Sequence, residues 1–480
     1  MNIIKLTDSY KVTHWLQYPP ETQVVYSYLE ARKASYGGEL SRTMFFGLQY
    51  FLKKYLTGVR VTEEFIQDGK DFWGKHLGNP DLFNEKGWRH ILEKHGGKLP
   101  VRIKAVPEGE VVEVKNILMS IENTDPECFW LTNYLETILV EVWYPSTVAS
   151  ASMFCRQMIY ESLVKSGTPS LIDFKLHDFG FRGVSSPESA GIGGAAHLIN
   201  FLGTDTAVGM EVLESYYQGE RPVAFSVPAS EHSTITAWGR ADEYKAFENM
   251  LDKYPEGIVA CVSDSFDIFE ACKVWAGPLK EKILARNGTL VVRPDSGTPE
   301  EIVPKILELL SPIGYTTNSK GYKVLDPHVR VLQGDGITPY SMELILDAVM
   351  KAGWSTDNIL FGMGGGLLQN WTRDSLSFAM KCSMIERNGI EVEVYKDPIT
   401  DKGKISKKGR QILKWGPKGT LPELQTVSES DNITMAKDIL QTVFENGELL
   451  VDHKLSDIRA RARAAEERFR EHRRMGTIEY

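Results

Sequence analysis

Five apolar segments in the middle of the chain each end in polar or glycine-rich residues, and this repeated pattern constrains the fold most strongly. The segments read FSVPASEHS, IVACVSDSFD, TLVVRPDSG, VRVLQGDG and NILFGMGGG. Their ends lie roughly 25 to 40 residues apart, which is the length of one strand–helix unit. Nearly continuous apolar strands are typical of a parallel sheet that is covered on both faces. We therefore predict a repeated βα architecture.

A further unit is expected over residues 176–206, which read LHDFGFRGVSSPESAGIGGAAHLINFLGTDT. Its length of roughly thirty residues suits a βαβ unit. Residues 198–202 are mostly apolar, so we expect a buried strand there. About six or seven units in total favour a closed or nearly closed (β/α) barrel over a doubly wound open sheet.

The two flanks of the chain lack this rhythm. Helical spacing is found over residues 45–56, Thr62 is a good helix N-cap, and residues 102–123 have a strand-like pattern. We expect an apolar helix over 130–144 that Pro145 stops, followed by a second helix to Lys165. After residue 373, Asn388-Gly389 predicts a hairpin, and residues 456–474 predict a charged terminal helix.

The predicted fold class is therefore α/β. An irregular (β/α) barrel is expected over residues 175–375 and would form the catalytic domain. A second domain, of the α+β class, is expected from residues 1–150 together with residues 376–480, which return to it.

Composition excludes several classes of protein. The chain has 480 residues and a net charge of −9, so we expect more than one domain and no binding of nucleic acid. No apolar run approaches the roughly eighteen residues that span a bilayer. The first residues, MNIIKLTDSYK, lack the long apolar region of a signal peptide, so we expect a cytoplasmic protein. The five cysteines lie far apart without CxxC spacing, which argues against a disulfide framework and a zinc site.

The strand ends of a barrel converge on one face, so polar residues that are distant in sequence are expected to meet there. Carboxylates alternate with arginines among these residues, a mixture that suits a ligand with both phosphates and hydroxyls, or a divalent metal bound to phosphates. The candidates are His177, Asp178, Phe179, Arg182, Asp205, His232, Asp264, Arg293, Asp295, Gly334, Asp335, Gly364, Gly365 and Arg373.

Each of these signals has a structural alternative. The glycines of residues 362–366 could cradle a phosphate or only form a tight turn. Arg293 and Asp295 could form a simple ion pair. His232 could be structural, a general base or a nucleophile that accepts phosphate. Phe179 could belong to the core or stack on a flat ring.

Motifs along nearly the whole chain carry a specific family resemblance. They are DSYKVTH, FFGLQY, FNEKGW, KAVPEG, ENTDPECFWLTN, LHDFGFRGVSS, GTDT, SVPASEHSTITAWG, SDSFDI, RPDSG, NSKGYK, QGDG, FGMGGGLLQ, TRD, KDP and SKKGR. With them the chain closely resembles the type II phosphoribosyltransferases of the nicotinate/nicotinamide phosphoribosyltransferase family. The resemblance implies transfer of phosphoribosyl from 5-phosphoribosyl 1-pyrophosphate to nicotinamide, with Mg²⁺, in NAD salvage.

The resemblance also implies roles for individual residues. Phe179 would lie on one face of the nicotinamide ring, with Tyr10 and the nearby Asp8 of a second subunit on the other, so a homodimer with shared active sites is expected. Arg182 would lie near the carboxamide oxygen, and Asp205 would accept a hydrogen bond from the carboxamide nitrogen.

The resemblance assigns the sugar and phosphates to a second group of residues. Asp295 would hold ribose hydroxyls, and Asp264 would lie near Mg²⁺, which the pyrophosphate mainly carries. His232 matches the histidine that ATP phosphorylates, so ATP is expected as a coupling co-substrate that improves turnover. The residues expected to contact the phosphoribosyl group and its phosphates are Arg293, Gly334, Asp335, Gly364, Gly365, Arg373, Lys381, Lys396 and Lys404.

Two other functions remain open at this point. A nicotinate phosphoribosyltransferase would have the same architecture, but Asp205 would repel the carboxylate of nicotinate. A catalytically silent binding or signalling homologue is the other alternative, and the presence of His232, Asp295 and the glycine loop argues against it.

Overall fold

The computed structural model describes the chain except for residues 401–404, 419–420, 432–436 and 475–480. The chain divides into two compact units. The sheet unit contains Met1–Ser150, Ser215–Gly219 and Trp371–Tyr480, and the barrel unit contains Ala151–Glu214 and Glu220–Asn370. Among the described residues, no helix is long and apolar enough to cross a membrane.

A parallel sheet of six strands forms the centre of the barrel unit, in the order β7-β6-β13-β12-β9-β8. Its strands are β6 (Leu176–Asp178), β7 (Gly203–Thr204), β8 (Glu256–Val262), β9 (Asn287–Arg293), β12 (Val329–Gln333) and β13 (Ile359–Met363). A small hairpin of β10 (Tyr315–Thr317) and β11 (Lys323–Leu325) lies apart from this sheet.

Residues 225–229 close the sheet into an irregular barrel. Phe225 forms a parallel bridge with Gly203 of the edge strand β7, and Ala229 forms one with Ala260 of the other edge strand, β8. Val227 of the same segment packs against a buried cluster of Ala260, Val291 and Leu332 inside the sheet. The predicted fold class, an irregular (β/α) barrel with an additional α+β domain, is confirmed.

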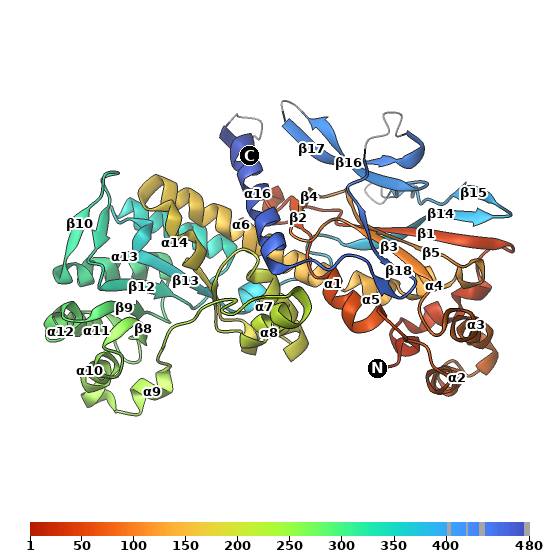
Figure 1. Ribbon diagram of the computed structural model, residues 1–480. Helices are drawn as coiled ribbons and strands as arrows, with labels where there is room; N and C mark the ends of the chain where they lie inside the picture. The colour runs from red at the N-terminus through yellow and green to blue at the C-terminus, as the bar shows by residue number, and fades with distance from the viewer. Residues whose placement is uncertain (401–404, 419–420, 432–436, 475–480) are drawn as a thin grey trace. The chain divides into compact units, whose positions relative to one another are not determined.

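Helices surround the strands of the barrel unit, and Figure 1 shows α10–α14 outside β8, β9, β12 and β13. The helices that follow α6 (Trp143–Ser166) are α7 (Pro187–His197), α8 (Ala207–Tyr217), α9 (His232–Thr236), α10 (Glu243–Lys253), α11 (Ile268–Ala276), α12 (Lys280–Leu284), α13 (Pro299–Leu310), α14 (Pro339–Lys351) and α15 (Gly365–Leu368).

The sheet unit is built on a seven-stranded sheet in the order β15-β14-β1-β5-β3-β18-β19. These strands are β1 (Thr22–Glu30), β3 (Val101–Ala105), β5 (Ile117–Asn123), β14 (Ala379–Arg387), β15 (Ile390–Glu393), β18 (Gln441–Glu445) and β19 (Glu448–Leu449). Two further pairs are formed by β2 (Arg42–Met44) with β4 (Val111–Glu113) and by β16 (Gln411–Lys418) with β17 (Leu421–Ser428). Asn388 and Gly389 have φ of 49° and 74° in the β14–β15 turn, which confirms the predicted hairpin.

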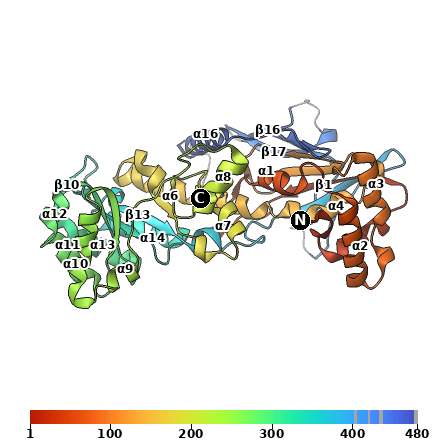
Figure 2. The ribbon, with the colours of Figure 1, turned by 60° about the horizontal axis from the view of Figure 1, so that its bottom comes forward.

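The helices of the sheet unit are α1 (Leu48–Phe51), α2 (Glu63–Leu77), α3 (Glu85–His95), α4 (Leu131–Tyr134), α5 (Glu136–Val140) and α16 (Leu455–Arg474). Figures 1 and 2 show α2 and α3 on one side of the large sheet and the β16–β17 hairpin on the other. Thr62 caps α2, because its side chain accepts a hydrogen bond from the Phe65 backbone N–H, as predicted.

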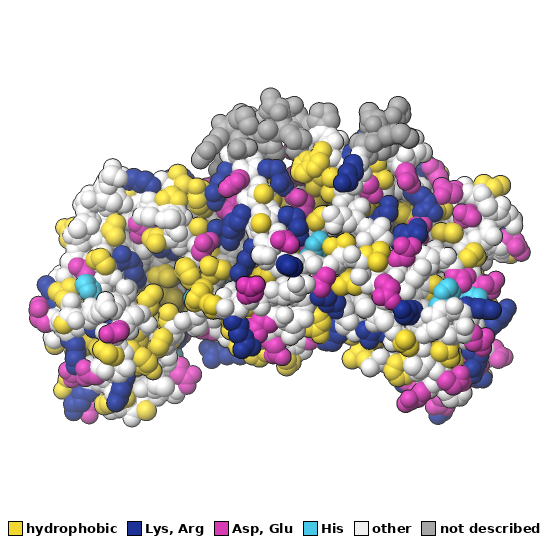
Figure 3. Space-filling view, viewed as in Figure 1, with side chains coloured by type: hydrophobic (Ala, Val, Ile, Leu, Met, Phe, Trp, Pro, Cys, Tyr) yellow, Lys and Arg dark blue, Asp and Glu magenta, His cyan; other side chains and the backbone are white. Residues whose placement is uncertain are grey.

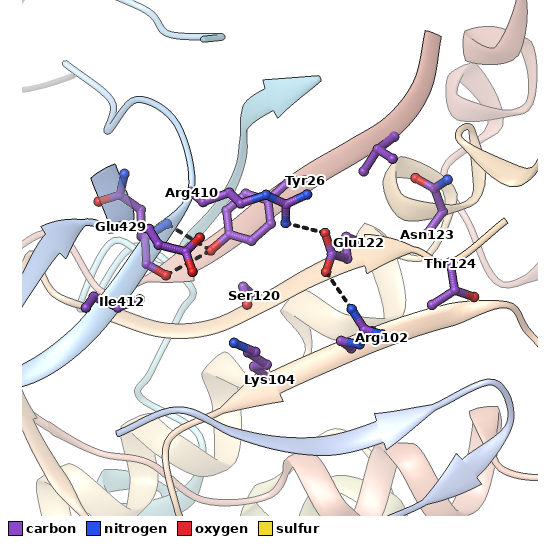
Figure 4. A pocket seen from close by; sticks show the side chains of 12 residues that line it. Tyr26, Arg102, Lys104, Ser120, Glu122, Asn123, Thr124, Arg410, Ile412 and Glu429 are labelled. Carbon is purple, nitrogen blue, oxygen red and sulfur yellow. Dashed lines mark hydrogen bonds and ion pairs between the residues drawn. The ribbon is translucent and has the colours of Figure 1, made fainter. Parts of the chain in front are cut away.

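The hairpin side of the large sheet carries a cavity of about 460 Å³ that contains a network of ion pairs (Figure 4). Glu122 on β5 lies between two arginines and accepts hydrogen bonds from Arg102 on β3 and from Arg410. The Tyr26 hydroxyl donates to the Gln411 carbonyl group beside them. The charges of Glu122, Arg102 and Arg410 are therefore paired with one another within the protein.

Two predicted elements differ from the structure. Residues 198–202 do not form a strand, because α7 continues to His197 and the following turn leads directly into β7. Pro145 does not stop a helix but lies in the first turn of α6, where a missing backbone N–H costs no hydrogen bond. Leu198, Ile199 and Phe201 of this run are fully buried, but they lie outside the ladder of the sheet.

Candidate active site

Residues that follow the carboxyl ends of five strands line one cavity of about 810 Å³ in the barrel unit. Nine of the predicted site residues line it, from the ends of β6, β7, β9, β12 and β13: Phe179, Arg182, Asp205, Arg293, Asp295, Gly334, Asp335, Gly364 and Gly365. The remaining wall comes from the segment before α7, with Gly183, Val184, Ser185, Ser186 and Pro187, together with Phe181 and Thr206.

Phe179 follows β6, and its ring lies over two glycines of neighbouring strands. A Cβ built on Gly362 would lie 2.0 Å from Cε2 of the ring, and one on Gly334 would lie 3.3 Å from it. The ring is half-buried and also packs against the apolar cluster inside the barrel. Part of the Phe179 ring therefore belongs to the core, and the residue also lines the cavity.

Asp205 follows β7, with its carboxylate exposed in the cavity wall. Its backbone N–H donates to the Asp178 carbonyl oxygen at 2.9 Å, and the Ser226 hydroxyl donates to its Oδ1 at 2.5 Å. Asp178 itself is fully buried, and this burial raises its pKa to about 6. Its Oδ1 accepts the Gly180 backbone N–H at 2.7 Å, so Asp178 shapes the turn that carries Phe179.

A group of charges lies at the ends of β8 and β9. His232 Nε2 is 3.0 Å from Asp264 Oδ1, and His232 Nδ1 is 3.9 Å from Asp295 Oδ2. Arg293 Nη2 lies 3.6 Å from Asp295 Oδ2, while the buried Arg293 Nε has no hydrogen-bond partner among the described residues. The pKa of Asp295 is raised, mainly by burial and further by the negative charges of Asp264 and Asp335, and the positive charge of Arg293 opposes this rise.

The glycine turn follows β13 and leads into α15. Gly364 lines the cavity beside Gly365, whose added Cβ would meet no atom within 4 Å. Gly366 differs, because a Cβ there would lie 2.3 Å from the Ile337 carbonyl oxygen. The backbone of the turn is therefore open to the cavity at Gly365, while close packing leaves no room for a side chain at Gly366.

The other predicted site residues belong to the sheet unit. Asp8 precedes the 3₁₀ helix η2 (Ser9–Leu16), and its Oδ2 accepts a hydrogen bond from the Thr137 hydroxyl at 2.7 Å. Tyr10 is 61% exposed. Lys381 on β14 has a lowered pKa, because burial and the nearby positive charges of Arg32 and Lys396 disfavour its protonated form.

Lys396 and Arg373 are exposed, and Arg373 Nη2 lies 3.5 Å from Asp374 Oδ1. Lys404 lies outside the described residues.

Sequence reasoning missed the roles of three residues, two beside the cavity and one at the opposite, amino ends of β6 and β13. Ser226 lies in a segment predicted as an ordinary strand, and Gly362, for which a phosphate cradle and a tight turn were both open, makes room for the Phe179 ring. Lys175 is fully buried and donates to the carbonyl groups of Thr356, Asp357 and Ile359 at 2.9–3.1 Å. Burial lowers its pKa to about 7. Of the three, only Gly362 offered a signal in the sequence, because a glycine within a strand often marks a place where another group approaches closely.

Solved structures of similar fold include nicotinate-nucleotide pyrophosphorylase from Pyrococcus furiosus and human nicotinic acid phosphoribosyltransferase. The first has a TM-score of 0.59 at 18% identity and covers 98% of this chain and 97% of its own. The second has a TM-score of 0.55 at 16% identity and covers 96% and 94%. At such low identities these likenesses support the fold alone.

Sequence comparison gives closer relatives. The chain is 48% identical over 472 residues to a nicotinamide phosphoribosyltransferase of Xanthomonas campestris pv. campestris, covering 97% of this chain and 98% of the relative. It is 33% identical over 504 residues to a nicotinamide phosphoribosyltransferase of Acinetobacter baylyi, covering 98% and 99%.

Family models match both parts of the chain. Residues 2–103 match the nicotinamide phosphoribosyltransferase N-terminal domain, and residues 174–448 match the nicotinate phosphoribosyltransferase (NAPRTase) family. The second match includes all the residues that line the 810 Å³ cavity of the barrel unit. The chain belongs to the nicotinate phosphoribosyltransferase family.

Proposed function

We propose that this enzyme, a pentosyltransferase, transfers the phosphoribosyl group of 5-phosphoribosyl 1-pyrophosphate to the ring nitrogen of nicotinamide. The products would be nicotinamide mononucleotide and pyrophosphate, as in NAD salvage, and we expect the reaction to take place in the cytoplasm. The single observation that carries the proposal is the cavity at the strand ends, where an aromatic ring, an exposed carboxylate, an arginine and a glycine turn meet. The names of the relatives support the same reaction.

The proposed pyridine pocket lies at the ends of β6 and β7. The Phe179 ring can stack on nicotinamide, a contact worth about 0.5–1.5 kcal/mol beyond burial. Asp205 accepts an N–H of the carboxamide, and its orientation is held by the Ser226 hydroxyl. A carboxylate at this position attracts an amide and repels the carboxylate of nicotinate, so one residue provides attraction and discrimination.

The proposed phosphoribosyl site lies at the ends of β9, β12 and β13. The unpartnered Nε of Arg293 is available to a phosphate oxygen, and the bare backbone of the glycine turn suits the 5′-phosphate. Departure of pyrophosphate leaves positive charge on the ribose ring, which the carboxylates of Asp295 and Asp264 would stabilise. The ring nitrogen of nicotinamide then forms the bond to the same ribose carbon that pyrophosphate leaves.

The carboxylates near His232 also fit a divalent cation. Burial raises the pKa of Asp295 most, the negative charges of Asp264 and Asp335 raise it further, and a bound cation would offset this repulsion. Carboxylate oxygens suit Mg²⁺, whose remaining ligands are usually water molecules and substrate phosphates. When bound, Mg²⁺ would neutralise charge on the pyrophosphate leaving group, and Asp264 and Asp295 would hold it.

His232 is the proposed site of ATP coupling. Its side chain is 45% exposed, and a neutral ring that donates from Nε2 to Asp264 carries its lone pair on Nδ1. That nitrogen could accept the γ-phosphate of ATP to form a phosphohistidine. His232 Nδ1 lies 3.9 Å from Asp295 Oδ2. A phosphoryl group on Nδ1 would therefore bring its negative charge close to the carboxylates proposed to surround the ribose and pyrophosphate.

We further propose a homodimer with shared active sites, in which Tyr10 of the partner subunit covers the second face of nicotinamide. The exposure of Tyr10, 61%, supports this role, because a large aromatic side chain is more often buried. Lys381, Lys396 and Arg373 are proposed to approach the phosphates.

Product analysis tests the proposed reaction. The purified protein is incubated with the pyrophosphate donor and with nicotinamide, nicotinate or quinolinate in parallel, with and without ATP. Nicotinamide mononucleotide from nicotinamide is the expected product, formed faster with ATP. Nicotinate mononucleotide as the main product, or no product from any of the three bases, would contradict the proposal.

A further inference from the structure

Two histidines, an aspartate and a cysteine form a compact cluster in the sheet unit, whereas the candidate active site lies in the barrel unit. His90 and His95 lie on α3, while Asp125 and Cys128 lie at the start and end of the short 3₁₀ helix η6 (Pro126–Cys128). Their metal-binding atoms all lie within 4.8 Å of one another. Nothing in the proposed phosphoribosyl transfer uses these four side chains.

Both imidazoles converge on one oxygen of Asp125. His90 Nε2 lies 2.8 Å and His95 Nε2 lies 2.6 Å from Asp125 Oδ2. The other oxygen, Oδ1, accepts the Glu127 backbone N–H at 2.9 Å, and the Asp125 carbonyl oxygen accepts the Asn123 side-chain amide at 2.8 Å. These hydrogen bonds fix the orientation of the Asp125 carboxylate, as is usual for carboxylate ligands of metals, and Oδ2 faces the histidines.

We propose that His90, His95, Asp125 and Cys128 bind one zinc ion, which ties the end of α3 to η6. Two imidazole nitrogens, one thiolate and one carboxylate oxygen make a ligand set of the kind that tetrahedral zinc sites use. Zinc–ligand bonds of about 2.0–2.3 Å place neighbouring ligand atoms roughly 3.3–3.6 Å apart. The two nitrogen–oxygen distances of 2.8 and 2.6 Å would therefore widen by less than about 1 Å, as rotation of the side chains allows.

Binding requires a change in protonation that can be measured. Burial, followed by the negative charges of Asp125 and Glu127, raises the pKa of the Cys128 thiol, so without metal it keeps its proton. On binding, the S–H bond breaks, the Zn–S bond forms and a proton goes to the buffer.

An ion can reach the cluster from solvent. The side chains of His90, His95 and Asp125 are 24%, 26% and 19% exposed. His90 also lines a cavity of about 580 Å³ beside α3. The space-filling view shows histidine side chains at the surface over α3 (Figure 3). The buried Cys128 forms the inner end of the cluster.

The spacing of the cysteines alone argued against a zinc site, because only one of the four ligands is a cysteine. The two pairs are separated by about thirty residues in sequence, and only the packing of α3 against η6 brings them together. The alternative explanation is a metal-free hydrogen-bond cluster in which Asp125 accepts from both histidines. The two explanations differ in metal content, spectrum and proton release.

The experiment uses the full chain, stripped of metal with a chelator and titrated with Co²⁺ and then with Zn²⁺. We expect about one ion per chain, a near-ultraviolet thiolate-to-Co²⁺ charge-transfer band, displacement of Co²⁺ by Zn²⁺ and release of a proton. Cys128→Ser should remove the charge-transfer band, and His90→Gln with His95→Gln should weaken binding by at least roughly 10- to 100-fold.

Two matched controls lie in the same unit. His76 on α2 is exposed and contacts Ser9, and Cys382 on β14 is a free thiol, so His76→Gln and Cys382→Ser should leave the titration unchanged. Absence of a stoichiometric site in the unaltered protein would overturn the proposal, even if the variants fail to fold. A band that persists in Cys128→Ser, or that disappears in Cys382→Ser, would overturn it as well.

Discussion

The Ser226 hydroxyl donates a hydrogen bond of 2.5 Å to Asp205 Oδ1, and both residues lie at the β7 edge of the barrel, where Phe225 forms a bridge with Gly203. Asp205 follows β7, while Ser226 lies in the segment 225–229 that joins β7 to β8. One carboxylate oxygen is therefore occupied within the protein, and the other is available to a ligand. The closure of the barrel and the orientation of the proposed specificity residue thus depend on the same short segment.

Ser226→Ala should weaken recognition of nicotinamide without abolishing the reaction. Loss of a hydrogen bond to a charged group costs about 1.5–3 kcal/mol, which corresponds to roughly 13- to 160-fold in kcat/KM. We expect most of this loss in KM for nicotinamide, with KM for the pyrophosphate donor nearly unchanged. Ser311→Ala, at the end of α13, is the matched control, and an equal loss for both substrates would contradict the assigned role.

Gly362→Ala should displace the Phe179 ring, because the new Cβ would lie 2.0 Å from its Cε2. Overpacking of this kind typically costs about 1–3 kcal/mol of folding stability. We expect a lower Tm and a KM for nicotinamide that rises by roughly tenfold or more, as for a misplaced contact residue. Gly365→Ala controls the stability measurement, since its Cβ meets nothing within 4 Å. A Gly362→Ala protein with unchanged Tm and KM would show that the ring has another position.

His232→Gln should remove the stimulation by ATP, because glutamine cannot form the phosphoramidate bond that a phosphohistidine contains. The ratio of steady-state rates with and without ATP should fall to about one. Transfer of label from the γ-phosphate of ATP to the protein, acid-labile in the unaltered enzyme, should disappear. A variant that is still stimulated by ATP would contradict the assignment of His232.

His197 should make the protein less stable in mild acid. The side chain is fully buried, and burial, assisted by the charge of His177, lowers its pKa to about 3. In the unfolded chain histidine binds a proton with a pKa near about 6.5. Between these two values the unfolded state binds more protons than the folded state, so the free energy of unfolding falls as pH falls from about 6.5 towards 3.

The pH dependence can be assigned by substitution. His197→Asn should lower stability at pH 7, because stacking on Phe201 is lost, but reduce the slope below pH 6.5 by up to about 1.4 kcal/mol per pH unit. Unfolding in denaturant at several pH values measures the slope. Exposed His76→Asn should leave it unchanged, and an unaltered slope in His197→Asn would contradict the account.

Much of the fold follows from patterns that are local in the sequence. Apolar strands with polar ends predicted the barrel, and Asn388-Gly389 predicted a hairpin because both residues tolerate positive φ. Residues 198–202 were misassigned because a short apolar run fits a strand and a buried turn equally well. Pro145 was misread because its effect depends on its position within a helix, which the sequence did not define.

The site shows the same limit. The carboxyl ends of parallel strands share one edge, so the sequence alone is enough to group Asp205, Arg293 and Asp295. The contact of Ser226 with Asp205 and the packing of Phe179 over Gly362 depend on how the barrel closes, which no local pattern encodes. The cluster around Asp125 is similar, because its two halves meet only through tertiary packing.

The central claim is that Asp205 makes this enzyme select an amide over a carboxylate. Its most direct test is the ratio of kcat/KM for nicotinamide to that for nicotinate, measured side by side for the unaltered protein and for Asp205→Asn. We predict a ratio of at least roughly 100 for the unaltered protein and a fall of roughly tenfold or more in the variant. A ratio near one, or a ratio that Asp205→Asn leaves unchanged, would contradict the account.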